Sequence, residues 1–394
     1  MPKPSVLIVS AARTPLGSFN GALAPLAATR LGSLALAEAL TRSGFTPEQL
    51  DEVIIGHVLS AGVGQAPARQ VALGAGLPRG VNCLTVNKVC GSSLKAVMLA
   101  ADAIALGRAR VVAAGGIESM SNAPYLLPQG RRGYRLGHGA VIDSMIKDGL
   151  WDVYNDFHMG NGAELCARRY RVTRAEQDEY AAASYNKALE AQRTGAFRRE
   201  IIPVVIPQDK GEPYTLAEDE QPRRADFKKM PRLPPVFAPD GSVTAGNASP
   251  ISDGATVMIV AASNVPRPAG VEPLGRILAY TQVATDPEWF SIAPVLAVNK
   301  LVQESGVALK KIDLIELHEA FAATTLAVMR ELKLNPKRVN VRGGAIALGH
   351  PIGASGARIL TTLLYALRDL NKHLGLATLC IGGGEAVAIL VERA

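Results

Sequence analysis

The segment GGAIALGHPIGASG, residues 343–356, places His350 inside a run of glycines and small residues. Such a run lets the backbone approach a ligand closely, because glycine has no side chain. Residues 354–370 are typical of a helix, so His350 is expected near a helix N-terminus, where backbone amides favour developing negative charge. The segment predicts a strand-to-helix turn that carries a functional histidine, with a purely structural glycine-rich turn as the alternative.

This turn has a counterpart in the first half of the chain. Gly353-Ala354-Ser355 resembles Gly91-Ser92-Ser93, and residues 313–317 resemble residues 51–55, both at an offset of 262 (353 − 91 and 313 − 51). Each turn is followed by an apolar helix and a strand ending in glycines, with the second copy about five residues longer after its helix. Short β-branched runs alternate with helices, as parallel sheets require. We therefore predict an α/β fold with two related βαβ halves.

The middle of the chain differs in composition from both halves. It contains Arg131-Arg132, many charges and a proline-punctuated stretch from residue 203 to residue 239. One helix is predicted there, opened by the capping box Thr173-Arg174-Ala175-Glu176 and stopped near Gly195. Long ordered insertions commonly carry binding sites. We divide the chain into an N-terminal half (1–120), an inserted loop domain (121–250) and a C-terminal half (251–394).

The composition narrows the class of protein. The chain has 394 residues, of which 48% are hydrophobic and 5% aromatic, and its 38 glycines suit a tightly packed α/β protein with more than one lobe. No apolar stretch reaches transmembrane length, and the start resembles neither a secretory nor a transit segment, so a cytoplasmic location is expected. The net charge of +7 suits a polyanionic ligand, with nucleic acid as the rival partner.

The four cysteines, Cys83, Cys90, Cys166 and Cys380, form no CxxC pair, which disfavours a zinc knuckle. Cys90, within NKVCGSS, is expected at the N-terminus of a central helix, where the pKa of a thiol falls and the thiolate is favoured. A small core cysteine explains Cys90 equally well. Cys380 precedes IGGG at the end of a strand, and by itself it is better explained as a core residue.

The sequence HEAFA, residues 318–322, follows a predicted strand. It is not HExxH, since residue 322 is alanine, so a helix-borne zinc protease site is excluded. His318 lies at the carboxyl end of its strand, where sites occur in α/β folds, although a structural histidine is an equal alternative. Gly62-Val63-Gly64 lacks the third glycine of a dinucleotide fingerprint, and no phosphate-binding loop is present.

Taken together, these segments resemble the motifs of the thiolase family. Its characteristic stretches occur in family order over almost the whole chain, at residues 87–93, 115–121, 244–249, 318–322, 343–356 and 380–384. The resemblance is greatest to biosynthetic acetyl-CoA acetyltransferases, because Phe157-His158-Met159-Gly160 matches the His-Met pair of their acyl pocket. It implies a five-layered α-β-α-β-α thiolase fold with a loop domain between the halves, assembled as a homotetramer or homodimer.

The resemblance also implies a reaction, the reversible Claisen condensation of two acetyl-CoA molecules to acetoacetyl-CoA and CoA. Cys90 would be the nucleophile that is acetylated, His350 would take its proton, and Cys380 would move the α-proton of the second acetyl-CoA. His350 and a water held by His318 would bind the enolate oxygen. The amides of Cys90 and Gly382 would bind the tetrahedral intermediate.

Further residues receive binding roles from the resemblance alone. Met159, Ala320 and Phe321 would bound the acyl pocket, and Tyr185 matches a potassium ligand of some members; no other metal and no cofactor is implied. The residues expected to bind coenzyme A are His158, Arg223, Arg224, Leu233, Phe237 and Ser249.

The sequence departs from the family pattern at His318, Ser93 and Glu385. Biosynthetic members usually have asparagine at the position of His318, and histidine there favours the alternative, a broader-chain 3-ketoacyl-CoA thiolase of fatty-acid β-oxidation. His158-Met159 favours the acetyl-specific enzyme. Ketoacyl-carrier-protein synthases share the architecture but use a Cys-His-His set, which Cys380 argues against. A non-catalytic basic scaffold that binds RNA is the alternative of a different class, and we expect no nucleic-acid partner.

Overall fold

Strands from both halves of the chain meet in one mixed β-sheet. The structure, a computed structural model, describes residues 4–208 and 211–394. The N-terminal part of the sheet has the order β1-β12-β5-β3-β4, and its strands are β1 (Val6–Arg13), β3 (Glu52–Gly56), β4 (Asn82–Val86), β5 (Val111–Ser119) and β12 (Ser252–Ala262), with the short β2 (Gly17–Ser18) beside β12. Every residue of β1, β5 and β12 is buried, as expected where helices cover both faces.

The C-terminal part repeats this order outward from the place where the two parts join. Residues 6–8 of β1 pair antiparallel with residues 275–277. From that join, the sheet continues through β13 (Gly275–Ala284), β16 (Glu385–Glu392), β15 (Leu374–Ile381) and β14 (Leu314–Leu317), which occupy the places of β1, β12, β5 and β3. Within each part the pair farther from the join, β3–β5 or β14–β15, is parallel, and the adjacent pair nearer the join, β5–β12 or β15–β16, is antiparallel. The two related halves are confirmed.

The spacing within the two halves is more regular than we expected. The helix that follows the glycine turn begins at Ser92 in one half and Ser355 in the other, and the next strand begins at Val111 and Leu374, so both offsets are 263 (355 − 92 and 374 − 111). The expected lengthening of the second copy was wrong. The prediction failed because it compared glycines in different positions. The glycines after Cys380 form the turn between β15 and β16, whereas Gly115 and Gly116 lie inside β5.

The strand pairing also moves the boundary of the C-terminal half. We assigned residues from 251 onward to that half, but β12 pairs with β1 and β5 of the N-terminal part along its length. The reason is topological: β12 occupies the same position as β16 does in the other half, and the insertion precedes it in the chain. The N-terminal unit therefore closes only after Ala262.

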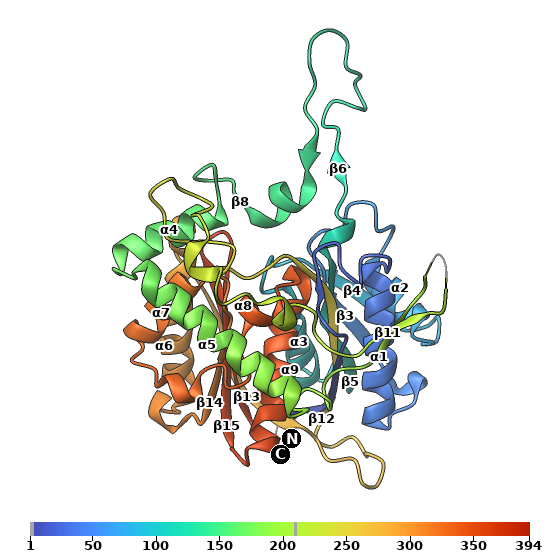
Figure 1. Cartoon of the computed structure of the whole chain (residues 1–394). Helices are drawn as coiled ribbons and strands as arrows, with labels where there is room; N and C mark the ends of the chain where they lie inside the picture. Colours follow the sequence, from blue (N-terminus) through green and yellow to red (C-terminus); the bar gives the residue numbers. More distant parts are fainter. Residues whose placement is uncertain (1–3, 209–210) are drawn as a thin grey trace.

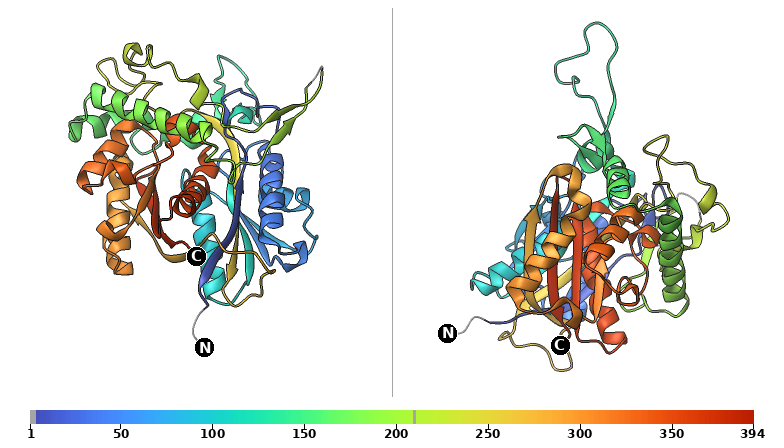
Figure 2. Two further views of the ribbon diagram at one scale, coloured as in Figure 1. Left: turned by 60° about the horizontal axis from the view of Figure 1, so that its bottom comes forward. Right: turned by 90° about the vertical axis from the view of Figure 1, so that its left-hand side faces the viewer.

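Helices cover the two sheet parts in five layers. α1 (Ala28–Ser43) and α2 (Pro67–Gly74) pack on the outer face of the N-terminal part, and α6 (Ala293–Ser305) packs on that of the C-terminal part. Between them lie α3 (Ser92–Ala105) and α9 (Ser355–Asp369), which contact each other and both sheet parts (Figure 2). The predicted α-β-α-β-α arrangement is confirmed, although hydrogen bonds between β1 and β13 make the two sheets continuous.

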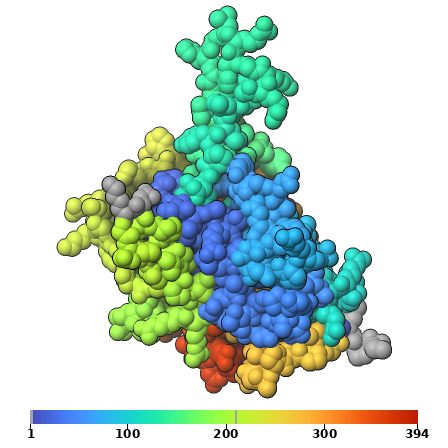
Figure 3. Space-filling model, turned by 90° about the vertical axis from the view of Figure 1, so that its right-hand side faces the viewer, coloured from blue at the N-terminus to red at the C-terminus, as the bar shows by residue number. Residues whose placement is uncertain are grey.

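The insertion lies over one end of these layers. It carries an arm that begins and ends with β6 (Tyr125–Leu126) and β7 (Ile142–Asp143) and stands out from the body (Figures 1 and 3). The predicted helix is α5 (Arg174–Arg193), and both hydrogen bonds of its Thr173–Glu176 capping box are present. The other elements outside the five layers are β8 (Trp151–Asp152), β9 (Phe157–His158), α4 (Met159–Arg169), β10 (Val204–Ile206), β11 (Tyr214–Leu216) and α8 (Ala345–Leu348). Helix α7 (Ala322–Glu331) instead packs beside α6 in the outer layer of the C-terminal part.

Helix α4 was not expected, because it contains two glycines. Both are required by packing: a Cβ on Gly160 would lie 2.3 Å from the Phe237 ring, and one on Gly162 would lie 2.7 Å from Phe290. Glycine lowers helix propensity in isolation, but here tertiary contact decides the conformation. Within the described ranges, every helix is too short or too polar to cross a bilayer.

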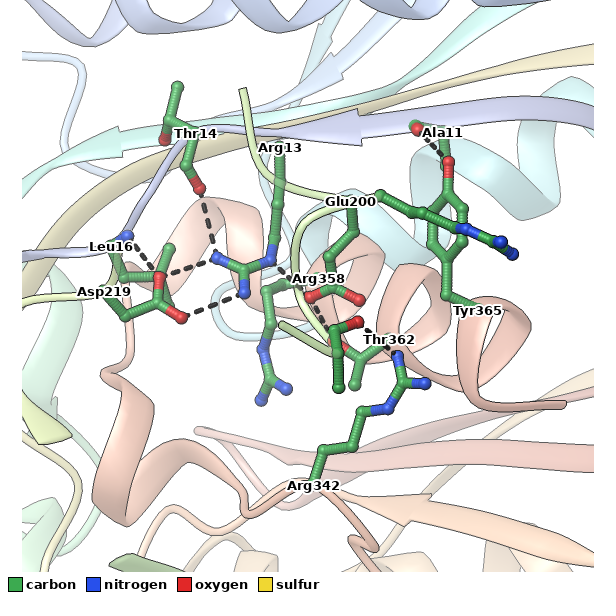
Figure 4. A network of polar contacts seen from close by, with 12 residues as sticks. Ala11, Arg13, Thr14, Leu16, Glu200, Asp219, Arg342, Arg358, Thr362 and Tyr365 are labelled. Atoms are coloured by element: carbon green, nitrogen blue, oxygen red, sulfur yellow. Dashed lines mark hydrogen bonds and ion pairs between the residues drawn. The ribbon is translucent and has the colours of Figure 1, made fainter. Parts of the chain in front are cut away.

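A buried ion network ties the insertion to β1. Arg13 is fully buried and donates two hydrogen bonds to the carboxylate of Asp219, at 2.7 and 2.9 Å (Figure 4). Its Nε also donates to Glu200 at 2.6 Å. Burial alone would lower the pKa of Arg13, but the two carboxylates raise it, so the guanidinium stays charged. Because Asp219 and Glu200 come from the insertion, the network fixes that segment on the sheet.

We predict that Asp219→Ala lowers the free energy of unfolding by roughly 3–5 kcal/mol, because it leaves a buried guanidinium without its main partner. Chemical denaturation measures this loss. Glu190→Ala is the matched control, since the ion pair of Glu190 with Arg193 is largely exposed, and it should leave the unfolding midpoint nearly unchanged. Equal effects of the two substitutions would contradict the assigned role of the network.

Candidate active site

A cavity of about 510 Å³ lies where the insertion covers the sheet near the carboxyl ends of β4 and β15. Cys90, Cys380 and His350, which are far apart in the sequence, all line it. A larger and more open cleft of about 690 Å³ lies along α5, but none of the predicted site residues lines that cleft. The other predicted residues that line the smaller cavity are His158, Met159, Phe237, Ser249, Ala320, Phe321 and Gly382.

Cys90 lies in a tight turn between β4 and α3. The preceding residue, Val89, has φ = +44°, a left-handed conformation that is strained for a β-branched side chain. Such strain costs about 1–3 kcal/mol and persists only where neighbouring contacts enforce it. Those contacts are present: Val89 N–H donates to Asn87 at 2.9 Å, and the Ser92 hydroxyl donates to the Val89 carbonyl at 2.7 Å. The turn lifts Cys90 out of the strand and aims it at the cavity.

Burial decides the protonation state of Cys90. The amides of Gly382 and Cys90 lower the pKa of the thiol, but burial and the nearby Glu118 outweigh them and raise the pKa to about 11. The expected thiolate at the helix N-terminus is therefore wrong for the resting protein, because α3 begins two residues later and its amides do not offset the loss of water. The thiol form of Cys90 is therefore favoured near neutral pH.

Cys380 lies near the end of β15 and lines the cavity. It is far from Cys90 in the sequence but close to it in space. Burial raises the pKa of Cys380, and the neighbouring Cys90 raises it further. The glycine turn that follows has a steric reason at Gly382, where a Cβ would lie 3.2 Å from the sulfur of Met159. A side chain at that position would close the cavity, so glycine keeps the Gly382 amide accessible.

His350 is held by the start of α9. Its Nδ1 lies 2.6 Å from the Ser355 hydroxyl oxygen, and that hydroxyl donates to the Pro351 carbonyl at 2.9 Å. A hydroxyl has one proton, so Nδ1–H must donate to Ser355, which leaves Nε2 as the free basic nitrogen. Burial lowers the pKa of His350 to about 3, with a further lowering from Arg358, so the imidazole is neutral and able to accept a proton.

His318 does not line the cavity but lies directly behind His350. The two ring centroids are 4.2 Å apart and the rings are tilted by 55°. His318 is 2% exposed, and neither of its ring nitrogens has a hydrogen-bond partner among the described residues. Burial lowers the pKa of His318 well below its usual value, and His350 and Arg358 lower it further.

Three aromatic or apolar side chains from the insertion narrow the cavity. The His158 ring stacks on Phe237 with centroids 4.8 Å apart, and Phe237 makes an edge contact with Phe321 at 6.2 Å. His158 Nδ1 accepts a hydrogen bond from the Gly160 amide at 3.0 Å, so the ring caps α4 and carries its proton on Nε2. Met159 packs with Ala320, Phe321 and Cys380 in one apolar cluster.

Ser249 lies at the mouth of this apolar region. Its amide donates to the Ala320 carbonyl at 3.0 Å, and the adjacent Ala248 forms an isolated bridge with Phe321. These contacts bring the segment 244–249 against the segment 318–322, although the two are about seventy residues apart in the chain. The hydroxyl of Ser249 remains at the cavity wall.

The remaining predicted binding residues lie away from the cavity lining. Arg223 and Arg224 are exposed, and Arg223 is ion-paired with Glu218. Leu233 is half-buried and packs toward Gly246. Tyr185 is buried, and its hydroxyl accepts a hydrogen bond at 3.1 Å from Gln221, a residue of the cavity wall. The cavity lining thus includes most of the predicted site residues but not these four, and not His318, which lies behind His350.

Two of the departures from the family pattern receive a structural explanation. Glu385 forms an ion pair with Lys88, so it joins the turn after Cys380 to the turn before Cys90. The Ser93 hydroxyl accepts a hydrogen bond at 2.9 Å from the amide of Ala357, which joins α3 to α9. Ser93 therefore contributes to the contact between the two helices.

Sequence reasoning missed the groups that position the reactive side chains. The buried carboxylate of Glu118 accepts hydrogen bonds from the amides of Gly353 at 2.9 Å and of Val58 and Leu59 at 3.2 Å, which ties the His350 turn to the end of β3. The acid within the segment GGIESMS could have signalled this role, because a charged residue inside a buried strand needs partners. Ser355, within the internal repeat, was the corresponding signal for His350.

Comparison with known proteins agrees with this geometry. Residues 6–264 match the family model described as thiolase, N-terminal domain, and residues 271–393 match thiolase, C-terminal domain. A Pseudomonas aeruginosa protein named acetyl-CoA acetyltransferase is 51% identical over 389 residues, which cover 98% of this chain and 99% of that protein. A Cupriavidus necator protein of the same name is 50% identical, over 98% and 99%.

Solved structures show the same relationship. The crystal structure of the Bacillus anthracis acetyl-CoA acetyltransferase superposes with a TM-score of 0.97 at 40% identity and covers 100% of both chains. An Ascaris suum thiolase in complex with coenzyme A gives a TM-score of 0.93 at 44% identity, covering 99% of this chain and 100% of that one. With the matched domains spanning nearly its whole length, the chain belongs to the thiolase family.

Proposed function

We propose that this chain is an acetyl-CoA C-acetyltransferase, an acyltransferase that condenses two acetyl-CoA molecules reversibly to acetoacetyl-CoA and CoA. The convergence of Cys90, His350 and Cys380 on one cavity carries the proposal. The names of the relatives at about half identity over full length favour it over the broader-chain 3-ketoacyl-CoA thiolase. On this proposal, an acetyl-CoA acetyltransferase accepts histidine at position 318, and His318 does not indicate a thiolase of fatty-acid β-oxidation.

Acetyl transfer begins with a neutral thiol beside a neutral base. As the Cys90 sulfur attacks the thioester carbonyl, its proton passes to Nε2 of His350, which the Ser355 contact leaves free. The carbonyl oxygen gains negative charge, and the amides of Cys90 and Gly382, which already point at the sulfur, are placed to bind it. The C–S bond to CoA then breaks, and the imidazolium returns the proton to the departing thiolate, leaving acetyl-Cys90.

Carbon–carbon bond formation requires a second base. Cys380 first gives its proton to neutral His350, and the resulting thiolate takes an α-proton from the second acetyl-CoA. The enolate oxygen is bound by His350 and by a water on His318, whose unpartnered ring nitrogens suit that role. The enolate carbon attacks acetyl-Cys90, the Cys90 sulfur leaves, and His350 reprotonates it. Raised pKa values at both cysteines make these proton transfers the costly steps.

The apolar part of the cavity suits a pantetheine arm and a short acyl group. We assign the arm to the His158–Phe237 stack and to Ser249, and the acetyl group to the space beside Met159, Ala320 and Phe321. His158 Nε2–H is a donor for an arm carbonyl. Arg223, Arg224 and Leu233 lie outside the cavity lining, so contact with the coenzyme A phosphates stays a prediction for the two arginines and contact with the arm for Leu233.

The arm supports assembly into a homotetramer or homodimer. Its side chains Tyr125, Leu127, Leu136 and Val141 are 59–101% exposed, and apolar side chains exposed together commonly mark protein–protein contacts. Potassium binding at Tyr185 stays a prediction from the family resemblance, since that hydroxyl supplies one oxygen and already accepts from Gln221. The cytoplasmic location and the absence of a nucleic-acid partner also stay predictions.

We predict that mixing the protein with acetyl-CoA produces an acetyl adduct on the Cys90 peptide in mass spectrometry. Cys380→Ala should keep the adduct but lose acetoacetyl-CoA formation by at least about a hundredfold, because it removes a general base. Cys166→Ala is the matched control, since that buried thiol lies outside the cavity, and it should retain activity. An adduct on Cys380 instead of Cys90 would contradict the assigned roles.

We predict that the enzyme cleaves acetoacetyl-CoA with added CoA at least about tenfold faster, in kcat/KM, than a ketoacyl-CoA of sixteen carbons. A long acyl chain must displace the packed Met159 and Phe321 side chains, and overpacking of a close-packed wall costs about 1–3 kcal/mol. Steady-state thiolysis assays measure both rates. A preference for the long chain would replace the proposal with the β-oxidation enzyme.

We predict that Val89→Gly does not lower the melting temperature yet slows acetylation of Cys90 by about tenfold. Glycine relieves backbone strain of about 1–3 kcal/mol, which outweighs its entropic cost of about 0.5–1 kcal/mol, but it also lets Cys90 leave its reactive position. Calorimetry and single-turnover acetylation measure the two effects. Unchanged acetylation in a stabilised variant would show that the strain has no role in aiming the thiol.

A further inference from the structure

Two contacts connect β14 to α9, one behind the other. The first is the contact between His318 and His350, with ring centroids 4.2 Å apart. The second is the ion pair between Glu316 and Arg358, whose Oε2 and Nη1 atoms are 3.7 Å apart. Glu316 precedes His318 by two residues, and Arg358 follows Ser355, which holds His350, by three residues. Residues two apart on a strand share a face, as do residues three apart on a helix. The guanidinium therefore lies directly behind the histidine pair.

The surroundings of Arg358 are unusual for an arginine. Its side chain is 1% exposed, and Nε, Nη1 and Nη2 have no hydrogen-bond partner among residues 4–208 and 211–394. Arg13 is equally buried, but its guanidinium donates hydrogen bonds to both Asp219 and Glu200 (Figure 4). Buried charged groups normally have partners, so an incompletely bonded arginine at this position requires an explanation.

Glu316 does not neutralise this charge at neutral pH. Burial raises the pKa of Glu316, and Glu319 and Glu200 raise it further against the opposing effect of Arg358 and Arg342, so the carboxyl is largely protonated. The other titratable groups at the rings are Cys90 and Cys380, both with raised pKa values and therefore neutral. Glu200 and Glu319 partly offset the charge of Arg358, and Arg13 adds to it. The positive charge of Arg358 still lowers the pKa of both His318 and His350.

We propose that Arg358 is a positioning residue for acetyl transfer: held against Glu316, its guanidinium places a fixed positive charge behind the His318–His350 pair and keeps both imidazoles neutral between proton transfers. The inference rests on the proposed function. It assigns Arg358 an effect on His350 without contact to substrate. Residues on the same face are about 6–7 Å apart along a strand and about 5 Å apart along a helix. At such separations the Coulomb interaction between the Arg358 guanidinium and a protonated imidazole is appreciable for both His318 and His350.

The charge has opposite effects on two steps. By disfavouring the imidazolium, it makes removal of the Cys90 proton harder. For the same reason it makes the imidazolium a stronger acid, so the proton returns faster to the departing CoA thiolate. The net benefit is in turnover, because a proton retained on His350 would leave CoA without protonation and would block the next proton transfer from Cys380. A loss of the charge should therefore separate thiol reactivity from turnover.

Arg358→Met removes the charge at similar length, and Arg358→Lys retains the charge. We expect Arg358→Met to be alkylated at Cys90 by iodoacetamide about tenfold faster at pH 7, because the thiolate–imidazolium pair then forms about one pH unit lower. Its kcat should fall by at least about tenfold while KM for acetyl-CoA stays within about twofold. Arg358→Lys should keep the wild-type alkylation profile. Rates are read on the Cys90 peptide by mass spectrometry across the pH range.

Two further variants separate this effect from a loss of structure. Arg342→Met is the matched control: it removes a buried arginine paired with Asp369, a charge that does not act on His350, and the alkylation profile should stay unchanged. Glu316→Gln keeps the Arg358 charge, so it should not speed alkylation. If Arg358→Met alone is too unstable, the double variant Glu316→Gln/Arg358→Met leaves no buried charge unpaired and should show the same faster alkylation.

Slower or unchanged alkylation in both charge-free variants would overturn the proposal and leave Arg358 a structural residue. An equal shift in Arg358→Lys would do the same, since the charge is retained there. Alkylation is measured without any CoA compound, so this outcome is independent of the proposed function. Failure of the function itself would appear instead as wild-type protein that forms no acetyl-Cys90.

Discussion

The close approach of two helix N-termini, α3 and α9, determines the positions of Cys90 and His350. A Cβ on Gly356 would lie 2.7 Å from the Leu94 backbone, and the Ser93 hydroxyl accepts a hydrogen bond from the Ala357 amide at 2.9 Å. Only glycine allows the helices so near each other. Because Cys90 precedes one helix and His350 precedes the other, this contact brings the proposed nucleophile and the proposed base from different halves of the chain to one cavity.

The same packing makes the site electrically neutral at rest. Burial raises the pKa of both cysteines and lowers that of His350 to about 3. Charge therefore appears only when a proton moves, and the groups that receive developing charge, such as the Gly382 amide, are fixed beforehand. The charge of Arg358 also favours the neutral form of His318 and His350, and we place it behind the two rings, away from the substrate.

The sequence predicted the outline of this arrangement because the residues involved have local signatures. The internal repeat, the glycines of residues 343–356 and the capping box at Thr173 each act over a few residues, and all reappear in the structure. What failed depended on distant partners. The pKa of Cys90 is set by burial, α4 is stabilised by contact with Phe237, and β12 joins the N-terminal sheet across the whole insertion.

The candidate site was predicted to a similar extent. Family motifs pointed to Cys90, His350 and Cys380, and all three line one cavity, because each lies in a short recognisable segment. Their catalytic roles stay a proposal. The groups that hold them, Glu118, Ser355 and Arg358, carry no motif that specifies a partner, since their roles arise from contacts between elements that are far apart in the chain.

The most direct test of the account is the exchange of α-deuterium from trideuterated acetyl-CoA into solvent water, followed by NMR on the wild type and on Cys380→Ala. If two sulfurs of one cavity divide the chemistry, the wild type exchanges the label, whereas Cys380→Ala retains it although Cys90 is still acetylated. Equal exchange by both proteins would contradict the assignment of proton abstraction to Cys380 and, with it, the shared cavity as the place of carbon–carbon bond formation.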